Sequence, residues 1–204
     1  MKAVLASANQ GKLKELGALL EPHGLSLVAQ GDLNIDAAEE TGCTFVENAL
    51  EKARHASRLS GLPAIADDSG IAVDALAGAP GVYSARFAGP DARDEDNNRK
   101  LISDLRALGK LIEGGDPGPG EATAHYYCAI VMLSHADDPT PLIATGRWNG
   151  QITSQARGAN GFGYDPYFYL HDKKLTAAEL TAAVKNRISH RGQAVTELLR
   201  QISS

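Results

Sequence analysis

Two adjacent carboxylates follow a short apolar segment in the first half of the chain. Residues 62–70 read Leu-Pro-Ala-Ile-Ala-Asp-Asp-Ser-Gly. A short apolar run bounded by turn-forming residues is typical of a buried strand. Because successive strand residues point to opposite faces, Asp67 and Asp68 are expected to serve different purposes. Buried carboxylates are costly unless paired, hydrogen-bonded or bound to a metal, so this segment is a candidate site. The alternative is an Asx-turn with Gly70 in a left-handed conformation.

A second candidate segment lies near the N-terminus. Residues 1–6 predict a strand, a turn of small residues runs from Ser7 to Lys12, and leucines at helical spacing follow. Backbone N–H groups at a helix start, together with the Lys12 charge, favour a bound phosphate. The turn lacks the two glycines and the Lys-Ser/Thr end of a Walker motif. In the alternative interpretation, Ser7 or Asn9 caps the helix and Lys12 is solvated.

A third segment combines acids with a helix. Residues 31–42 form a polar loop containing Glu40, and residues 44–47 (Thr-Phe-Val-Glu) match a capping box, so a helix is expected to start near Thr44. Asn48 and Lys52, four residues apart, share a helix face that could point at the same pocket as Glu40. The alternatives are a favourable interaction of Glu40 with the helix dipole and an ordinary salt bridge for Lys52.

The C-terminal third contains two further candidates. Residues 158–168 read Gly-Ala-Asn-Gly-Phe-Gly-Tyr-Asp-Pro-Tyr-Phe, a loop in which Phe162 could stack on a base and Asp165 could accept from a purine N–H. The alternative is an aromatic corner at a sheet edge. Ser189 is the expected N-cap of the last helix, which puts His190 and Arg191 in a first turn where basic side chains oppose the dipole. This misfit indicates an anionic or carbonyl-bearing ligand, with a pair of solvated cations as the alternative.

The remaining elements predict an α/β protein. We expect strands at residues 25–29, 71–76 and 124–134, with residues 142–152 as antiparallel partner of the third, and a helix over residues 176–185. The strand at 71–76 is expected to pair with 64–67 after a turn. Residues 91–108 begin with a charge cluster, interpreted as a solvated face, and continue as an amphipathic helix.

Composition excludes several classes of function. A chain of 204 residues with a hydrophobic fraction of 43% can bury a proper core, and we expect one domain over residues 1–204. A net charge of -5 without a basic block argues against a nucleic acid polymer as partner. Cys43 and Cys128 provide neither a disulfide framework nor zinc-ligand spacing. No apolar run is long enough for a membrane helix and the N-terminus lacks a signal peptide, so we expect a cytoplasmic protein without membrane contact.

Taken together, a base-stacking loop, isolated lysines, a phosphate-type turn and acids at two loop ends suit a nucleoside triphosphate and a hard cation such as Mg²⁺. Seven motifs then carry a resemblance: Ser7-x-Asn9-x-x-Lys12, Glu39-Glu40-Thr41-Gly42, Phe45-x-Glu47-Asn48-Ala49-x-x-Lys52-Ala53, Ala66-Asp67-Asp68-Ser69-Gly70, Gly81-Val-Tyr-Ser-Ala-Arg86, Gly161-Phe-Gly-Tyr-Asp-Pro166 and Ser189-His-Arg-Gly192. In their types and order, from about residue 2 to about residue 200, they resemble the inosine/xanthosine triphosphate pyrophosphatase family.

The resemblance implies hydrolysis of deaminated purine nucleoside triphosphates (ITP, dITP, XTP) to the monophosphate and pyrophosphate. It implies that Glu40 and Asp68 hold Mg²⁺ and that Asp68 also orients or deprotonates the attacking water. The implied substrate-binding residues are those that grip phosphates, with Ser69 nearby, and those that stack on or read the purine: Ser7, Ala8, Asn9, Gln10, Gly11, Lys12, Lys52, Ser69, Phe162, Gly163, Tyr164, Asp165, Lys185, His190 and Arg191.

The resemblance also implies a mixed central sheet flanked by helices, two lobes with a long active-site cleft between them, and a homodimer. Two rival functions remain at this stage. A nucleotide kinase or other phosphoryl transferase would release orthophosphate or need an acceptor, and the absence of a Walker motif weighs against it. A nucleotide-sensing module would bind without turnover and would need no carboxylate that holds a metal.

Overall fold

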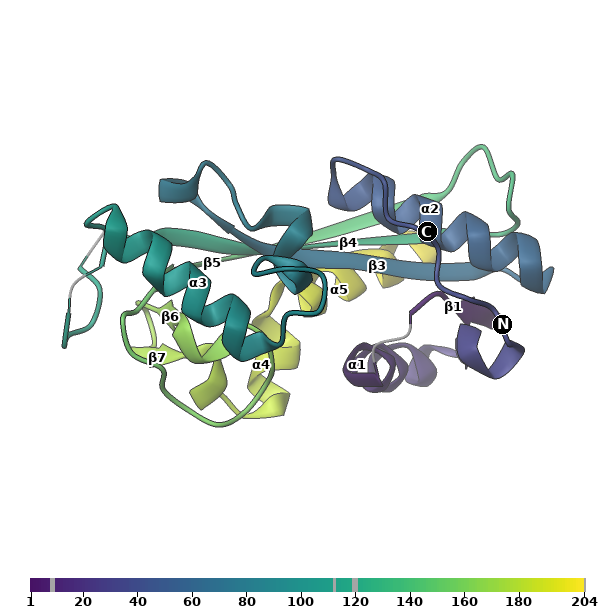
Figure 1. Ribbon diagram of the computed structural model, residues 1–204. Coiled ribbons are helices and arrows are strands. Elements are labelled where there is room, and N and C mark those ends of the chain that lie inside the picture. The colour runs from purple at the N-terminus through teal and green to yellow at the C-terminus, as the bar shows by residue number, and fades with distance from the viewer. Residues whose placement is uncertain (8–9, 112, 119–120, 204) are drawn as a thin grey trace. The chain divides into compact units, whose positions relative to one another are not determined.

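The computed structural model describes residues 1–7, 10–111, 113–118 and 121–203 (Figure 1). The strands are β1 (Lys2–Leu5), β2 (Ser26–Ala29), β3 (Ala64–Val73), β4 (Thr123–Leu133), β5 (Leu142–Ile152), β6 (Phe168–Leu170) and β7 (Leu175–Thr176). The α-helices are α1 (Gln10–Leu20), α2 (Phe45–Ser60), α3 (Asp94–Ala107), α4 (Ala182–Ile188) and α5 (His190–Ile202). None of the helices in these described ranges has the length and apolarity to cross a membrane.

The strands form one mixed sheet in the order β2-β1-β3-β4-β5-β6-β7. β1 runs parallel to β2 and to β3, with Val4 opposite Ala64 and Leu5 opposite Ile65. β6 runs antiparallel to both β5 and β7. The prediction of an α/β fold with a mixed central sheet flanked by helices is therefore confirmed.

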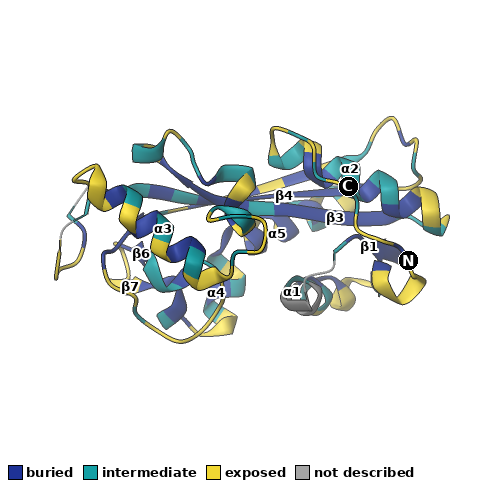
Figure 2. Ribbon diagram, viewed as in Figure 1, coloured by how far each residue is buried: buried dark blue, intermediate teal, exposed yellow. Residues whose placement is uncertain are grey.

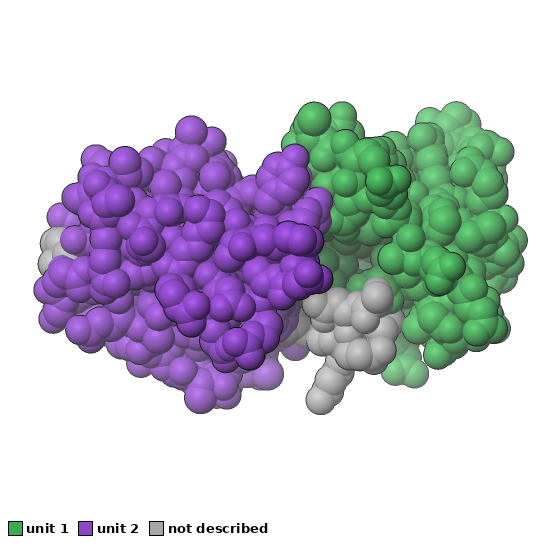
Figure 3. Space-filling model, in the orientation of Figure 1, with its two compact units in different colours: residues 1–68, 128–146, 190–204 green, residues 69–127, 147–189 purple. Residues whose placement is uncertain are grey.

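The chain folds into two compact units, coloured separately in Figure 3. Unit 1 comprises residues 1–68, 128–146 and 190–204, and unit 2 comprises residues 69–127 and 147–189. Each unit collects segments from distant parts of the sequence. The chain passes from one unit to the other within β3, within β4, within β5 and between α4 and α5.

Unit 1 has helices on both faces of its part of the sheet. One core contains apolar side chains of α1, α5 and the strands, among them Ala3, Leu5 and Ile65. The other face receives α2, which packs against β1 and buries Ala49 and Ala53. Alternate residues of β1 and β3 therefore face different helices, and Figure 2 shows β3 buried along its length. This alternation determines which helix each β3 carboxylate meets.

Unit 2 has a separate, aromatic core. The ring of Tyr126 lies 4.7 Å from that of Phe168, and Trp148 lies 5.2 Å from Phe168, measured between centroids. Leu101 and Leu105 of α3 belong to the same cluster. Tilted aromatic pairs at these distances add to the stabilisation from burial. Tyr164, which follows Phe162 in its loop, belongs to this core as well, so the core supports both the loop and α3.

The capping residues in the sequence predicted the two ends of α2 correctly, but two expectations about other elements were wrong. Thr44 forms the predicted capping box with Glu47, and α2 ends at Gly61 in a left-handed conformation. The turn predicted at residues 67–70, with two separate strands around it, is absent: β3 is continuous from Ala64 to Val73. The helix predicted over 176–185 is broken, because Leu180 is extended and Thr181 caps a new helix, α4, through the Val184 N–H.

Candidate active site

Asp67 and Asp68 are neighbours in β3 and meet different helices, as the alternation of a strand requires. Asp67 shares the parity of Ile65, which lies in the core formed with α1 and α5. Its Oδ2 lies 2.9 Å from Lys12 Nζ of α1 and 3.6 Å from an Arg191 guanidinium nitrogen of α5. The Asp67 side chain is fully buried, and although burial opposes ionisation, Lys12, Arg191 and Lys52 hold its pKa well below the usual range. Asp67 is thus a buried anion that fixes two cations from distant segments.

Asp68 points to the opposite face and meets α2. Its Oδ1 accepts from Lys52 Nζ at 2.8 Å, and its Oδ2 accepts from Asn48 Nδ2 at 3.3 Å. The same Lys52 ammonium donates to Glu40 Oε1 at 2.9 Å. Glu40 and Asp68, predicted from separate motifs, are therefore both within 3 Å of one nitrogen atom.

The electrostatics of this group follow from its burial. Burial raises the pKa of Asp68, helped by the neighbouring Glu40, and Lys52 only partly offsets this. Burial works against the charged form of Lys52 as well, but Asp68, Glu40 and Asp67 outweigh it and raise the Lys52 pKa. Lys52 therefore remains charged between Glu40 and Asp68. Asp68 is a stronger base than an aspartate on the surface.

Asn48 joins this pair to the loop that contains Glu40. Its Oδ1 accepts from Gly42 N at 2.8 Å while its Nδ2 donates to Asp68. A backbone N–H can only donate, so the Gly42 contact fixes which end of the Asn48 amide faces Asp68. Gly42 has no space for a side chain, because a Cβ would lie 2.8 Å from Asn48 Oδ1. The sequence placed Asn48 on the correct helix face but did not identify this bridging contact.

The oxygen donors fit a hard divalent cation that also binds phosphate. Within the described ranges, no group of three or more His, Cys, Asp or Glu side chains is placed to hold a metal. Glu40 and Asp68 already accommodate a cation between them in the form of Lys52. Mg²⁺ usually takes one or two carboxylates together with substrate phosphates and water, so this pair suits it.

Unit 2 contains the second predicted cluster, in the loop from Gly161 to Asp165. Phe162 is 40% exposed, and Lys185 Nζ lies 4.8 Å from the centroid of its ring. Asp165 is buried, and its Oδ2 accepts from Phe162 N at 2.9 Å and from Lys185 Nζ at 2.6 Å. A Cβ at Gly161 would overlap the Asp165 carboxylate, so glycine is required there. Asp165 therefore shapes the loop, and Phe162 is its exposed aromatic surface.

Tyr164 anchors the same loop from its other side. Its hydroxyl donates to Ser84 O at 2.7 Å, and Ser84 Oγ in turn accepts from Ile71 N at 2.9 Å. Burial raises the pKa of the Tyr164 hydroxyl, and the charge of the neighbouring Asp94 raises it further. Tyr164 is 4% exposed, so its side chain is an anchor of the loop.

The other predicted residues are distributed over both units. His190 and Arg191 occupy the first turn of α5 and are buried, and Gly146 of β5 leaves space for the His190 carbonyl. Ser7 follows β1, Gln10 and Gly11 open α1, and Ser69 lies in β3. Ala8 and Asn9 lie outside the described residues. Unit 1 therefore brings together Lys12, Glu40, Lys52, Asp67, Asp68 and Arg191, and unit 2 brings together Phe162, Asp165 and Lys185.

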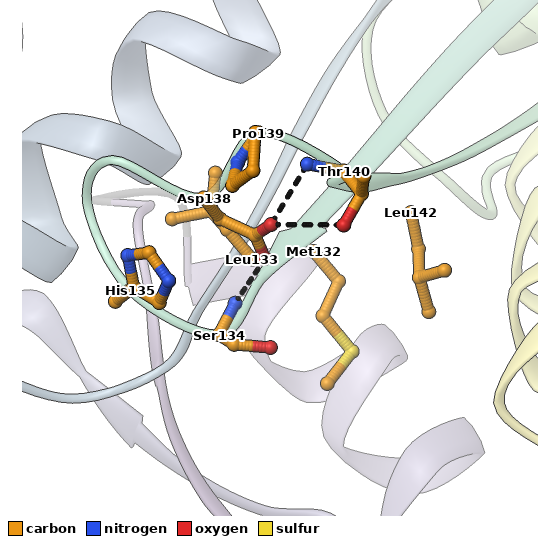
Figure 4. A pocket seen from close by; sticks show the side chains of 8 residues that line it. All are labelled: Met132, Leu133, Ser134, His135, Asp138, Pro139, Thr140 and Leu142. Atoms are coloured by element: carbon orange, nitrogen blue, oxygen red, sulfur yellow. Dashed lines mark hydrogen bonds between the residues drawn. The ribbon is translucent and has the colours of Figure 1, made fainter.

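A pocket of about 380 Å³ lies elsewhere in unit 1, at the connection between β4 and β5 (Figure 4). Ser134, His135, Asp138 and Thr140 line it together with apolar side chains. The Asp138 carboxylate accepts hydrogen bonds from Ser134 N and Thr140 N, both 2.9 Å long. The pocket shares no residue with either cluster, and its polar atoms serve the turn.

The described residues thus combine an α/β fold with a buried carboxylate pair and flanking lysines in unit 1 and an exposed aromatic loop in unit 2. The chain belongs to the Ham1 family, whose sequence profile matches residues 3–201. It is 54% identical to the dITP/XTP pyrophosphatase of Shigella flexneri and 52% identical to that of Escherichia coli K12. Each match covers 198 residues, 97% of this chain and 96% of the relative.

Solved structures agree with this assignment. A HAM1 protein from Coxiella burnetii matches with a TM-score of 0.89 and 43% identity, and the Staphylococcus aureus Ham1 protein with a TM-score of 0.84 and 35% identity. Both matches cover 100% of this chain and 98% of the other. The family resemblance predicted from seven motifs is confirmed.

Proposed function

We propose that this protein hydrolyses deaminated purine nucleoside triphosphates, ITP, dITP and XTP, to the monophosphate and pyrophosphate. The observation that carries the proposal is the pair Glu40 and Asp68, joined by Lys52 in a chain whose family relatives are named dITP/XTP pyrophosphatases. The reaction removes these nucleotides from the pool. We further propose one catalytic domain over residues 1–204 that acts in the cytoplasm as a homodimer.

The phosphate chemistry is assigned to unit 1. Lys12 and Lys52, with the backbone from Ser7 to Gly11, bind phosphate oxygens through N–H groups and positive charge. Ser69 is assigned to the same end of the substrate. Glu40 and Asp68 would hold Mg²⁺, which would supply charge neutralisation for a departing pyrophosphate. Asp68 orients a water molecule and takes its proton as the water oxygen attacks the α-phosphorus.

The base chemistry is assigned to Phe162, Gly163, Tyr164, Asp165, Lys185, His190 and Arg191. Phe162 stacks on the purine, a contact worth about 1–3 kcal/mol per base. Asp165 and Lys185 hold the loop in the geometry that stacking requires. Hypoxanthine and xanthine have a carbonyl at position 6, whereas adenine has an amino donor. Donors from His190 and Arg191 pair with the carbonyl and are left without a partner by adenine, which penalises ATP.

Product analysis with labelled water tests the proposal. ITP, Mg²⁺ and H₂¹⁸O should yield IMP and pyrophosphate, with the label in IMP, because water attacks the α-phosphorus. IDP and orthophosphate as products would refute the proposal and favour a different phosphohydrolase. Binding of ITP without turnover would favour a nucleotide sensor. A panel of ITP, dITP, XTP, GTP and ATP, followed through pyrophosphate release, then ranks the substrates.

A further inference from the structure

The loop that contains Phe162 is held by the first two turns of α3, a segment that none of the seven motifs includes. Gly163 N donates to Asp94 Oδ2 at 2.6 Å, and Asn98 Nδ2 donates to Gly163 O at 2.9 Å. Both polar groups of this residue are thus bound by one helix, although 69 and 65 residues separate the partners in sequence. Asp94 and Asn98 are four apart and so share a face of α3.

These two bonds fix two consecutive peptide planes. The Gly163 N–H belongs to the peptide that follows Phe162, and the Gly163 C=O belongs to the peptide that precedes Tyr164. Because each peptide is rigid, orienting both planes sets the backbone angles that aim the Phe162 side chain. Gly163 has a φ of 63°, in the left-handed region, and glycine is the residue with the most conformational freedom to lose. The two bonds to α3 therefore act at a position where the residue type itself restricts the backbone least.

The contacts inside the loop bind other atoms than the two polar groups of Gly163. The bond from Phe162 N to Asp165 Oδ2 closes the loop on itself. Lys185 and the Tyr164–Ser84 bond hold residues that follow Gly163. Asp165 N also donates to Phe162 O, at 3.3 Å, so Asp165 holds the carbonyl of the peptide that follows Phe162, while Asp94 binds the N–H of the same peptide from outside the loop. Asn98 is buried, which excludes water from its bond, whereas Asp94 supplies a charged and therefore stronger acceptor.

We propose that Asp94 and Asn98 are positioning residues that set purine affinity and selectivity by orienting the Gly163 peptides and hence the Phe162 ring. The inference rests on the proposed function, in which Phe162 stacks on the base. It assigns no chemical step to either residue. Their loss should weaken the binding of ligands that contain a base and leave the binding of a bare phosphate chain unchanged.

The test compares two ligands in the Asp94→Ala and Asn98→Ala variants. We expect kcat/KM for ITP to fall about tenfold, mainly through KM, while the inhibition constant of tripolyphosphate stays within about twofold. The preference for ITP over ATP should shrink. Asp94→Asn, which retains an acceptor oxygen, should restore most of the loss. Glu95→Ala is the matched control, because it removes an exposed acid from the same first turn, and the ion pair of Glu95 among the described residues is with Arg93, at 3.9 Å.

Hydrogen exchange separates the possible failures. The Gly163 amide should exchange faster in Asp94→Ala than in Glu95→Ala, since its acceptor is removed. Faster exchange with unchanged ITP kinetics would reduce the two residues to structural anchors and overturn the proposal. Equal losses for ITP and tripolyphosphate would overturn it as well. Failure of the unmodified protein to convert ITP to IMP and pyrophosphate would instead refute the proposed function, and this result is recognised before any variant is made.

Discussion

Lys52 donates to Asp68 Oδ1 at 2.8 Å and to Glu40 Oε1 at 2.9 Å, so one ammonium group joins the two acids that are proposed to hold the metal. The Lys52 side chain is only 13% exposed, and a charge this buried needs partners. A divalent cation bound by the same carboxylates would compete with the ammonium. A substrate phosphate offers Lys52 an alternative anionic partner. Lys52 is therefore expected to couple metal binding to nucleotide binding.

Replacement of Lys52 by Gln tests this coupling. Without the ammonium, Glu40 and Asp68 repel each other and gain more from a divalent cation. In the absence of nucleotide, the variant should bind Mn²⁺ about tenfold or more tightly than the unmodified protein, which corresponds to ~1.4 kcal/mol. Titration followed by electron paramagnetic resonance measures this directly. Turnover of ITP should fall by about 10²–10³-fold, because a preorganised charge on the phosphates is lost.

Lys100→Gln is the control for that measurement. Lys100 pairs with Asp104 at 2.9 Å on the partly exposed face of α3, so the variant has the same change in net charge. Its Mn²⁺ affinity should match that of the unmodified protein. If Lys52→Gln binds Mn²⁺ equally or more weakly, Lys52 supports the carboxylates and does not compete for them.

Asp68→Asn should separate binding from turnover. The amide retains the shape of the side chain but cannot accept a proton from water, so kcat should fall by about 10²–10⁴-fold. Calorimetric ITP affinity should change little, because the phosphate and base contacts remain. Asp36→Asn makes the same chemical change at an exposed position of unit 1 and should leave kcat intact. Normal pyrophosphate release by Asp68→Asn would remove the role proposed for this carboxylate.

For Asp67 and Asp68, the sequence predicted some features correctly and others wrongly. Strand alternation correctly predicted that Asp67 and Asp68 serve different purposes, because parity is a local property. Turn chemistry wrongly predicted that β3 would end there. The carboxylates remain inside a buried strand because Lys12, Arg191 and Lys52 compensate them. Those cations come from distant segments, and no local pattern indicates that they converge.

The charge cluster that begins residues 91–108 is largely solvated, as predicted, but the two asparagines that follow it are buried. Glu95 and Arg99 are exposed, as expected for such a face. Asn97 and Asn98 are buried, and Asn97 holds residues 85–88 through Ala85 O and Ala88 N. Polar residues look alike in sequence whether they face water or a neighbouring backbone. Asparagine has a low helix propensity. Two adjacent asparagines within a predicted helix were therefore the feature of the sequence that indicated a role other than helix formation.

Arg191→Ala should affect both stability and selectivity. Its guanidinium lies 3.6 Å from the fully buried Asp67, which would keep Lys12 as its closest cation. Removing one partner of a buried pair costs about 3–5 kcal/mol when nothing else compensates, so the loss here should lie below that range. At a temperature where the variant is folded, kcat/KM for ITP should fall far more than that for ATP. Equal losses would indicate that Arg191 binds phosphate or only packs.

Asp138 provides a pH-dependent prediction away from both clusters. Hydrogen bonds from Ser134 N and Thr140 N lower the pKa of its carboxyl below the usual value (Figure 4). A depressed folded-state pKa means that the unfolded chain takes up the proton first as the pH falls. The stabilisation is therefore complete above the unfolded pKa of about 3.9 and is lost as the pH falls below it towards the folded pKa. This places the window of lost stability in the acid range.

Asp138→Asn should accordingly lower the melting temperature at pH 7 by a few degrees, because one of the two backbone donors then faces an amide NH₂ group in place of an oxygen. At pH 3 the difference from the unmodified protein should shrink, since the native carboxylate has lost part of its advantage. Asp137→Asn is the matched control: that side chain is 87% exposed and contacts Arg58 at 3.3 Å. Calorimetric melting of the three proteins at both pH values measures the effect. A difference between Asp138→Asn and the unmodified protein that stays constant from pH 7 to pH 3 would show that packing of the turn, and not the charge of Asp138, stabilises the connection between β4 and β5.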